Sequence, residues 1–159
     1  MSDEQNREFM EEAIRLAALN MDATHGGPFG CVIVKDGRII ASAYNEVLRT
    51  NDPTAHAEIV AIRRACEKLN SYQLAGCEIF TSCEPCPMCL GAIYWSRPAK
   101  VYYAASRKDA EKAGFDDNHI YQEVAVPDQN RVIPFEQFMP DKVVKLFQQW
   151  VQLKRDVNY

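Results

Sequence analysis

His56-Ala57-Glu58 and, after residues 59–85, Cys86-Pro-Met-Cys89 are the two segments from which the architecture and chemistry of this 159-residue chain can be worked out. They offer one imidazole and two thiols, which are ligand types that zinc prefers, and a carboxylate that these ligands leave free. Catalytic zinc usually keeps three protein ligands and a fourth position for water, whose pKa it lowers from about 15.7 toward roughly 7. The pattern therefore predicts a catalytic zinc site held by His56, Cys86 and Cys89, with Glu58 as general base and then acid.

Cys83 leaves an alternative open. It extends the run to Cys83-x-x-Cys86-x-x-Cys89, and three thiolates with His56 could close the coordination sphere as a structural site. The chain would then be a zinc-stabilised binding module without turnover. A closed site would leave Glu58 without a role, and Cys83 precedes the helix expected after Pro87, so we expect Cys83 not to be a ligand.

Periodicity places the metal-site residues at the starts of two helices. Apolar residues recur at helical spacing over 55–69, with Thr54 as the expected cap, and a second helix is expected from about Pro87. The positive end of a helix stabilises a thiolate, so Cys86 and Cys89 should ionise more readily than an ordinary cysteine.

The rest of the chain alternates helical and strand patterns. A helix is expected after a cap at Ser2 or Asp3, Asp36-Gly37 predicts a tight turn between two antiparallel strands, and further strands are expected at 78–81 and 101–104. Helical crossovers imply parallel strands as well. The expected fold is α/β, a three-layer α/β/α sandwich with a mixed sheet.

Composition limits the class of protein. A chain that is 47% apolar and has no linker or low-complexity tract predicts one compact domain over residues 1–159. The N-terminus lacks an export signal and no apolar run could span a bilayer, so we expect a cytoplasmic protein without a membrane partner, and cysteines without disulfides. The net charge of −4, with scattered Lys and Arg, argues against nucleic acid and for a small uncharged substrate.

The chain resembles the cytidine deaminase superfamily and, within it, the small bacterial guanine deaminases. The resemblance covers nearly the whole length. Besides the zinc pattern it rests on Gly26-Gly-Pro-Phe-Gly30, Asn45, Asn51-Asp-Pro-Thr-Ala-His-Ala-Glu58, Ser82-Cys-Glu-Pro-Cys-Pro-Met-Cys89, Gly91-Ala-Ile-Tyr-Trp95, Gly114-Phe-Asp-Asp117 and Tyr159. It implies a cytidine-deaminase-like fold with a mixed five-stranded sheet, one Zn²⁺ per subunit, and hydrolytic deamination of guanine to xanthine and ammonia. Guanosine deaminase, tRNA adenosine deaminase and cytosine deaminase are the alternatives with the same chemistry.

Three residues are candidates for binding the base. Phe29 follows a Gly-Gly-Pro loop and is suited to stacking on a purine or to core packing. Asn45 follows a strand and offers a donor and an acceptor to a base edge, or stabilises a turn. Trp95 lies on an apolar helix face, as a pocket wall or a core residue.

The resemblance adds three more. It implies that Asp117 is an acid that contacts the ring nitrogen or exocyclic amine of the substrate, a role that Asp116 could also fill, and that Ala57 takes part in substrate binding. It also implies that Tyr159 belongs to a C-terminal segment that folds over the active site, in some members that of the partner subunit.

The C-terminal segment carries an apolar face on a helix expected from about Pro140 to Arg155. Such a face must pack against something, and residues 127–134 could act as a hinge. Exchange of an element between protomers is a low-cost route to a dimer. We therefore expect a homodimer in which residues 127–159 are exchanged.

Overall fold

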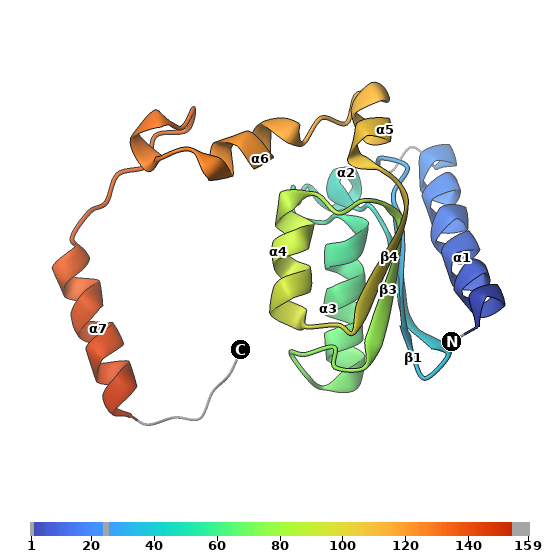
Figure 1. Cartoon of the computed structure of the whole chain (residues 1–159), viewed down its shortest axis with the longest axis horizontal. Coiled ribbons are helices and arrows are strands. Elements are labelled where there is room, and N and C mark those ends of the chain that lie inside the picture. Colours follow the sequence, from blue (N-terminus) through green and yellow to red (C-terminus); the bar gives the residue numbers. More distant parts are fainter. Residues whose placement is uncertain (1, 24–25, 154–159) are drawn as a thin grey trace. The chain divides into compact units, whose positions relative to one another are not determined.

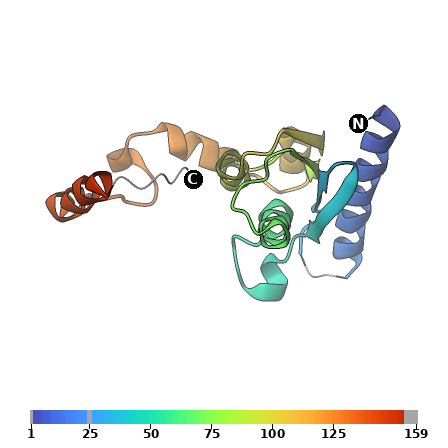
Figure 2. The same cartoon turned by 90° about the horizontal axis from the view of Figure 1, so that it is seen from below.

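The computed structural model describes residues 2–23 and 26–153, and divides the chain into two compact units at Asn118. The first unit contains α1 (Asp3–Asp22), β1 (Gly30–Lys35), β2 (Arg38–Tyr44), α2 (Val47–Thr50), α3 (Ala57–Leu69), β3 (Cys77–Cys83), α4 (Pro87–Ser96), β4 (Lys100–Ala105) and α5 (Arg107–Lys112). The second contains α6 (Asn118–Ala125), which begins at the boundary, η1 (Asp128–Asn130) and α7 (Pro140–Gln152). The elements are shown in Figures 1 and 2.

The sheet is mixed, as predicted, but in the described part of the chain it has four strands, in the order β2-β1-β3-β4. β1 pairs antiparallel with both β2 and β3, while β3 and β4 are parallel. The prediction of five strands is wrong for these residues. After Ala105 the apolar β-branched runs are short, and each ends at a proline, at Pro127 or Pro134, which cannot donate to a ladder of hydrogen bonds.

Helices cover both faces of this sheet, which confirms the three layers (Figure 1). Helix α1 packs against β1 and β3 on one face, and α3 packs against β1 and β2 on the other, beside α4. The side chains of β1 alternate accordingly. Cys31 and Ile33 join the core under α3, whereas Val32 and Val34 join the core under α1.

Most of the turns and helix caps predicted from the sequence are present in the structure. Asp36 and Gly37 both have positive φ, 49° and 70°, as a type I′ hairpin turn requires. Ser2 caps α1, and its hydroxyl accepts a hydrogen bond from the backbone of Gln5. The predicted cap at Thr54 is wrong: its hydroxyl donates to Asp52 Oδ1 at 2.7 Å, and the N-cap of α3 is the metal-ligand candidate His56.

The second unit is short of buried side chains. No residue of α6 or α7 is buried within the chain as described. The face of α7 carries exposed apolar residues, among them Phe147, which is 66% exposed. The predicted helix is therefore present, though its expected end at Arg155 lies outside the described residues. No helix in the described ranges is long and apolar enough to cross a membrane.

Candidate active site

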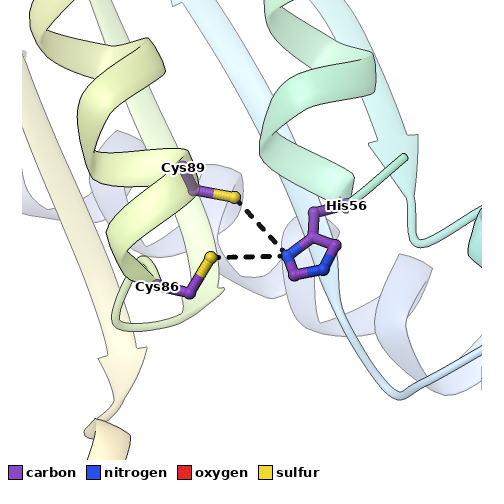
Figure 3. Close-up of side chains that lie close together, drawn as sticks. All are labelled: His56, Cys86 and Cys89. Carbon is purple, nitrogen blue, oxygen red and sulfur yellow. Dashed lines mark hydrogen bonds between the residues drawn. The ribbon is translucent and has the colours of Figure 1, made fainter. Parts of the chain in front are cut away.

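His56, Cys86 and Cys89 come together at the starts of α3 and α4 (Figure 3). Both cysteine sulfurs point at one ring nitrogen: His56 Nδ1 lies 3.5 Å from Cys86 Sγ and 3.6 Å from Cys89 Sγ. A tetrahedral zinc about 2.05 Å from nitrogen and 2.3 Å from sulfur holds these atoms about 3.6 Å apart. The two observed distances are thus the edges of a zinc tetrahedron, and the donor set fits the metal.

The helix starts explain this convergence. His56 and Cys86 are the N-caps of α3 and α4, and no side chain caps either helix. Cys89 lies one turn into α4 and is fully buried. Hydrogen bonds from Cys89 and His56 lower the pKa of the Cys86 thiol to about 4. Cys86 is therefore a thiolate at neutral pH, which is the form that binds a metal.

Cys83 does not join this cluster. Its sulfur lies 3.9 Å from the carbonyl oxygen of Ser106, to which the thiol donates, and the ligand atoms that lie within reach of one another are those of His56, Cys86 and Cys89. Burial raises the pKa of the Cys83 thiol to about 11, so it stays protonated. Its position supports an open zinc site with three protein ligands.

Glu58 lies in the first turn of α3 and is buried next to the ligands. Its Oε1 accepts a hydrogen bond from the Thr81 hydroxyl at 3.3 Å, and its Oε2 lies 3.6 Å from Cys89 Sγ. Burial raises the pKa of the Glu58 carboxyl above its ordinary value. This is the direction required of a group that takes up and releases a proton near neutral pH.

A cavity of about 410 Å³ opens over the metal cluster. That volume is in the range of roughly 300–1,000 Å³ typical of small-molecule sites. It is lined by Gly27, Phe29, Asn45, Val47, Leu48, His56, Glu58, Cys83, Glu84, Cys86, Arg107, Ala110, Phe115, Asp116 and Asp117. All of these residues belong to the first unit, so its fold brings together the metal cluster and the walls of one cavity.

Four residues predicted to bind substrate or act in catalysis line this cavity: Phe29, Asn45, Glu58 and Asp117. Phe29 packs edge-on against Phe115, with ring centroids 4.9 Å apart and an interplanar angle of 81°. Asn45 accepts a hydrogen bond from Val47 N at its Oδ1. Burial, followed by the neighbouring Cys86 thiolate, raises the pKa of the Asp117 carboxyl.

Residues 3–105 match the family model described as the cytidine and deoxycytidylate deaminase zinc-binding region. The chain belongs to this family of zinc-dependent deaminases. The predicted resemblance and the zinc cofactor are thereby confirmed. Bound zinc requires three protein ligands and an open position for catalysis, and the deaminase presents such a set in His56, Cys86 and Cys89.

Known relatives differ in how much of the chain they resemble. Guanine deaminase from Bacillus subtilis (strain 168) is 56% identical over 95% of this chain and 97% of its own. An X-ray structure of guanine deaminase from Bacillus subtilis covers 100% of the chain and 99% of its own at a TM-score of 0.92 and 52% identity. A tRNA-specific adenosine deaminase from Aquifex aeolicus (strain VF5) is 49% identical, but over only 51% of this chain and 54% of its own.

One further relative is a mutant protein whose crystal structure is of a complex with 8-azaguanine. It is 38% identical, and the alignment covers 69% of this chain and 63% of that one at a TM-score of 0.66.

Ala57 and Trp95, two residues predicted to bind the substrate of the deaminase, do not line the cavity. Ala57 is fully buried in the core beneath α3. Trp95 is 63% exposed on α4, so it is neither a core residue nor part of the cavity lining in this chain. Tyr159 lies outside the described residues. The roles of all three in substrate binding stay predictions.

Other residues lie at the site of the deaminase although no sequence pattern predicts them there. Glu84 and Arg107 line the cavity, and the Arg107 backbone N–H donates to Glu84 Oε2 at 2.9 Å, which joins the end of β3 to the start of α5. Phe115 also lines the cavity, and it lies between the glycine and the two aspartates of Gly114-Phe-Asp-Asp117. Thr81 reads as an ordinary strand residue, and only the register of β3 brings it to Glu58.

Proposed function

We propose that this deaminase hydrolyses guanine to xanthine and ammonia. The proposal rests on the similarity to guanine deaminase, which covers 95% of the chain and so extends past the shared zinc-binding region of residues 3–105. The cavity is completed there, by Arg107, Ala110, Phe115, Asp116 and Asp117. The likeness to tRNA-specific adenosine deaminases covers less of the chain, between 49% and 71%.

The cavity suits a free purine. Its volume of about 410 Å³ admits a single base, and the structure of one relative is of a complex with a purine analogue, 8-azaguanine. Four carboxylates line it, those of Glu58, Glu84, Asp116 and Asp117, against one arginine. Such a lining repels phosphate groups, so an uncharged base fits it better than a nucleotide or a nucleic acid.

The metal ligands, Phe29, Asn45 and Asp117 each have a role in this reaction. His56, Cys86 and Cys89 would hold zinc, which when bound would supply an activated water at neutral pH. Phe29 stacks on the base, since base–aromatic stacking contributes about 1–3 kcal/mol whatever the base. Asn45 and Asp117 bind polar groups on its edge and fix C2 near the metal cluster.

Glu58 moves the proton in this scheme. Its carboxylate accepts a proton from the attacking water, delivers it to a ring nitrogen of guanine, and serves again as the amine leaves from C2. Water adds one oxygen and two hydrogens overall, and the products are xanthine and ammonia. The burial of Glu58 beside the metal cluster supports this role.

We further propose that the enzyme is a homodimer in which residues 127–159 are exchanged, so that Tyr159 closes the partner's cavity. The exposed apolar face of α7 supports this, because Val143, Val144 and Phe147 are at least 46% exposed within the described chain.

The six free cysteines, two of them metal ligands, suit the reducing cytoplasm as the site of action.

Ammonia release tests the proposal. Zinc-loaded protein is incubated separately with guanine, guanosine, cytosine, adenine and an adenosine-bearing tRNA anticodon stem. Release from guanine alone is expected. Release only from another substrate would reassign the pocket, and no release with zinc bound would favour the closed structural site. Light scattering tests the dimer, and a monomer at micromolar concentration would exclude it.

A further inference from the structure

Asn20 connects the two loops that carry Phe29 and Asn45. It lies near the end of α1, is only 1% exposed, and does not line the cavity. Its Nδ2 donates two hydrogen bonds to backbone carbonyl oxygens, one to Gly27 at 2.8 Å and one to Asn45 at 3.0 Å. One buried amide group therefore ties both loops to the same helix.

Backbone hydrogen bonds complete the arrangement. The Phe29 N–H donates to the Gly27 carbonyl at 2.8 Å, and the Asn45 N–H donates to the Phe29 carbonyl at 3.0 Å. The Gly27 carbonyl thus accepts from both Asn20 and Phe29. A shift of either loop would break bonds to the other, so the positions of Phe29 and Asn45 are coupled.

Gly26 lets these groups approach closely. A Cβ at this position would lie 2.6 Å from Asn45 Oδ1, 2.8 Å from the Asn45 carbonyl oxygen and 3.1 Å from Asn20 Nδ2. Only glycine fits there without moving the asparagines. The loop is packed directly on the amide of Asn20, which leaves little room for it to drift if the hydrogen bonds stay intact.

Asparagine is the side chain that this position requires. A carboxamide nitrogen supplies two N–H donors from one atom, whereas a hydroxyl supplies one and a carboxylate none. Without these donors the buried Asn45 carbonyl and the part-buried Gly27 carbonyl would each lose a partner, which is costly away from water.

We propose that Asn20 is a positioning residue for substrate binding, which acts through the loops that hold Phe29 and Asn45 against the base. The inference rests on the proposed function, because those two residues bind guanine in it. The zinc ligands and Glu58 lie at the starts of α3 and α4, whereas the Asn20 amide donates to the backbone of Gly27 and Asn45. Loss of the Asn20 amide should therefore weaken binding more than it slows the chemical step.

Kinetics of Asn20→Leu test this, because leucine has a similar volume and no donor. The expected result is a rise in KM for guanine of about tenfold or more, with kcat changed much less and zinc content equal to that of the parent protein. Asn20→Asp should raise KM at least as much, since its carboxylate would face two carbonyl oxygens. Asn20→Ser keeps one donor, is the milder change if Leu does not fold, and should give an intermediate KM.

Asn6→Leu is the matched control. Asn6 is on the same helix and donates from Nδ2 to Tyr102 Oη at 3.5 Å, away from the active-site cavity. Its KM should equal that of the parent, even where thermal unfolding shows lost stability. Equal KM values for the parent and all three Asn20 variants, below their unfolding temperatures, would overturn the inference. No ammonia from guanine with the parent protein would instead overturn the proposed function.

Discussion

The Thr81 hydroxyl donates a hydrogen bond to Glu58 Oε1 at 3.3 Å, and both side chains are buried. Thr81 lies on β3, on the sheet face that packs under α3, while the other carboxylate oxygen of Glu58 accepts from Cys89 at 3.6 Å. The Glu58 carboxylate, the proposed proton-transfer group, is thus held between β3 and α4. Its geometry depends on the sheet as much as on its own helix.

Thr81→Val should lower kcat for guanine about tenfold, because a hydrogen bond to a charged group contributes about 1.5–3 kcal/mol and valine keeps the shape of threonine. KM should change little, since Thr81 does not line the cavity. Steady-state kinetics of zinc-loaded protein measure both. Thr50→Val, which removes a hydroxyl bound to the Glu46 carbonyl, is the control and should leave kcat intact.

Glu58→Gln should keep zinc and lose about 10²–10⁴-fold in kcat, because glutamine has the same shape and cannot take up a proton. Metal analysis and ammonia release are the two measurements. A variant that holds zinc and still releases ammonia at the parent rate would remove Glu58 from the mechanism.

The metal ligands could be predicted from sequence because their pattern is short-range. His56 and Glu58 are two residues apart, and Cys86 and Cys89 are one helical turn apart, so local helix starts place each pair correctly. The Asp36-Gly37 hairpin and the Ser2 cap were predictable for the same reason. Each of these features depends on a few neighbouring residues.

Features that depend on distant segments could not be read in this way. Thr81 meets Glu58 only through the pairing of β3 in the sheet, and Asn20 reaches Asn45 across 25 positions. The number of strands was wrong because it came from the resemblance and not from a strand pattern after Ala105. Whether Trp95 contacts substrate depends on what covers the outer face of α4, which periodicity does not reveal.

Cys83→Ala should retain zinc, whereas Cys86→Ala should lose it. The two sites differ because Cys86 Sγ lies 3.5 Å from His56 Nδ1, while the Cys83 thiol donates to the Ser106 carbonyl. Zinc content after dialysis distinguishes them, expressed per chain of folded protein. Metal loss from Cys83→Ala equal to that from Cys86→Ala would make Cys83 a ligand and close the site.

Zinc affinity should rise with pH. In the metal-free protein the hydrogen bond to the Cys86 thiolate raises the pKa values of both Cys89 and His56. Groups with raised pKa values keep their protons to higher pH, and zinc must displace these protons to bind. Competition for the proton therefore weakens binding as pH falls and is relieved as pH rises.

Competition with a fluorescent chelator across a pH series measures this affinity, and calorimetry in buffers of different ionisation enthalpy counts the protons released. Proton release on binding is the expected result. A zinc affinity that is independent of pH, with no proton released, would contradict the assignment of the protons to Cys89 and His56.

Phe115→Leu should raise KM for guanine about two- to tenfold, because an edge-to-face aromatic pair contributes about 0.5–1.5 kcal/mol and Phe115 holds the Phe29 ring in place. Gly27→Ala should act in the same direction, since its Cβ would lie 2.7 Å from the Phe29 ring and 3.2 Å from Phe115. Phe9→Leu breaks a different aromatic pair, with Phe80, outside this cavity, and should cost stability without changing KM. A KM for Phe115→Leu no higher than that for Phe9→Leu would show that the edge-on contact does not orient Phe29 for binding.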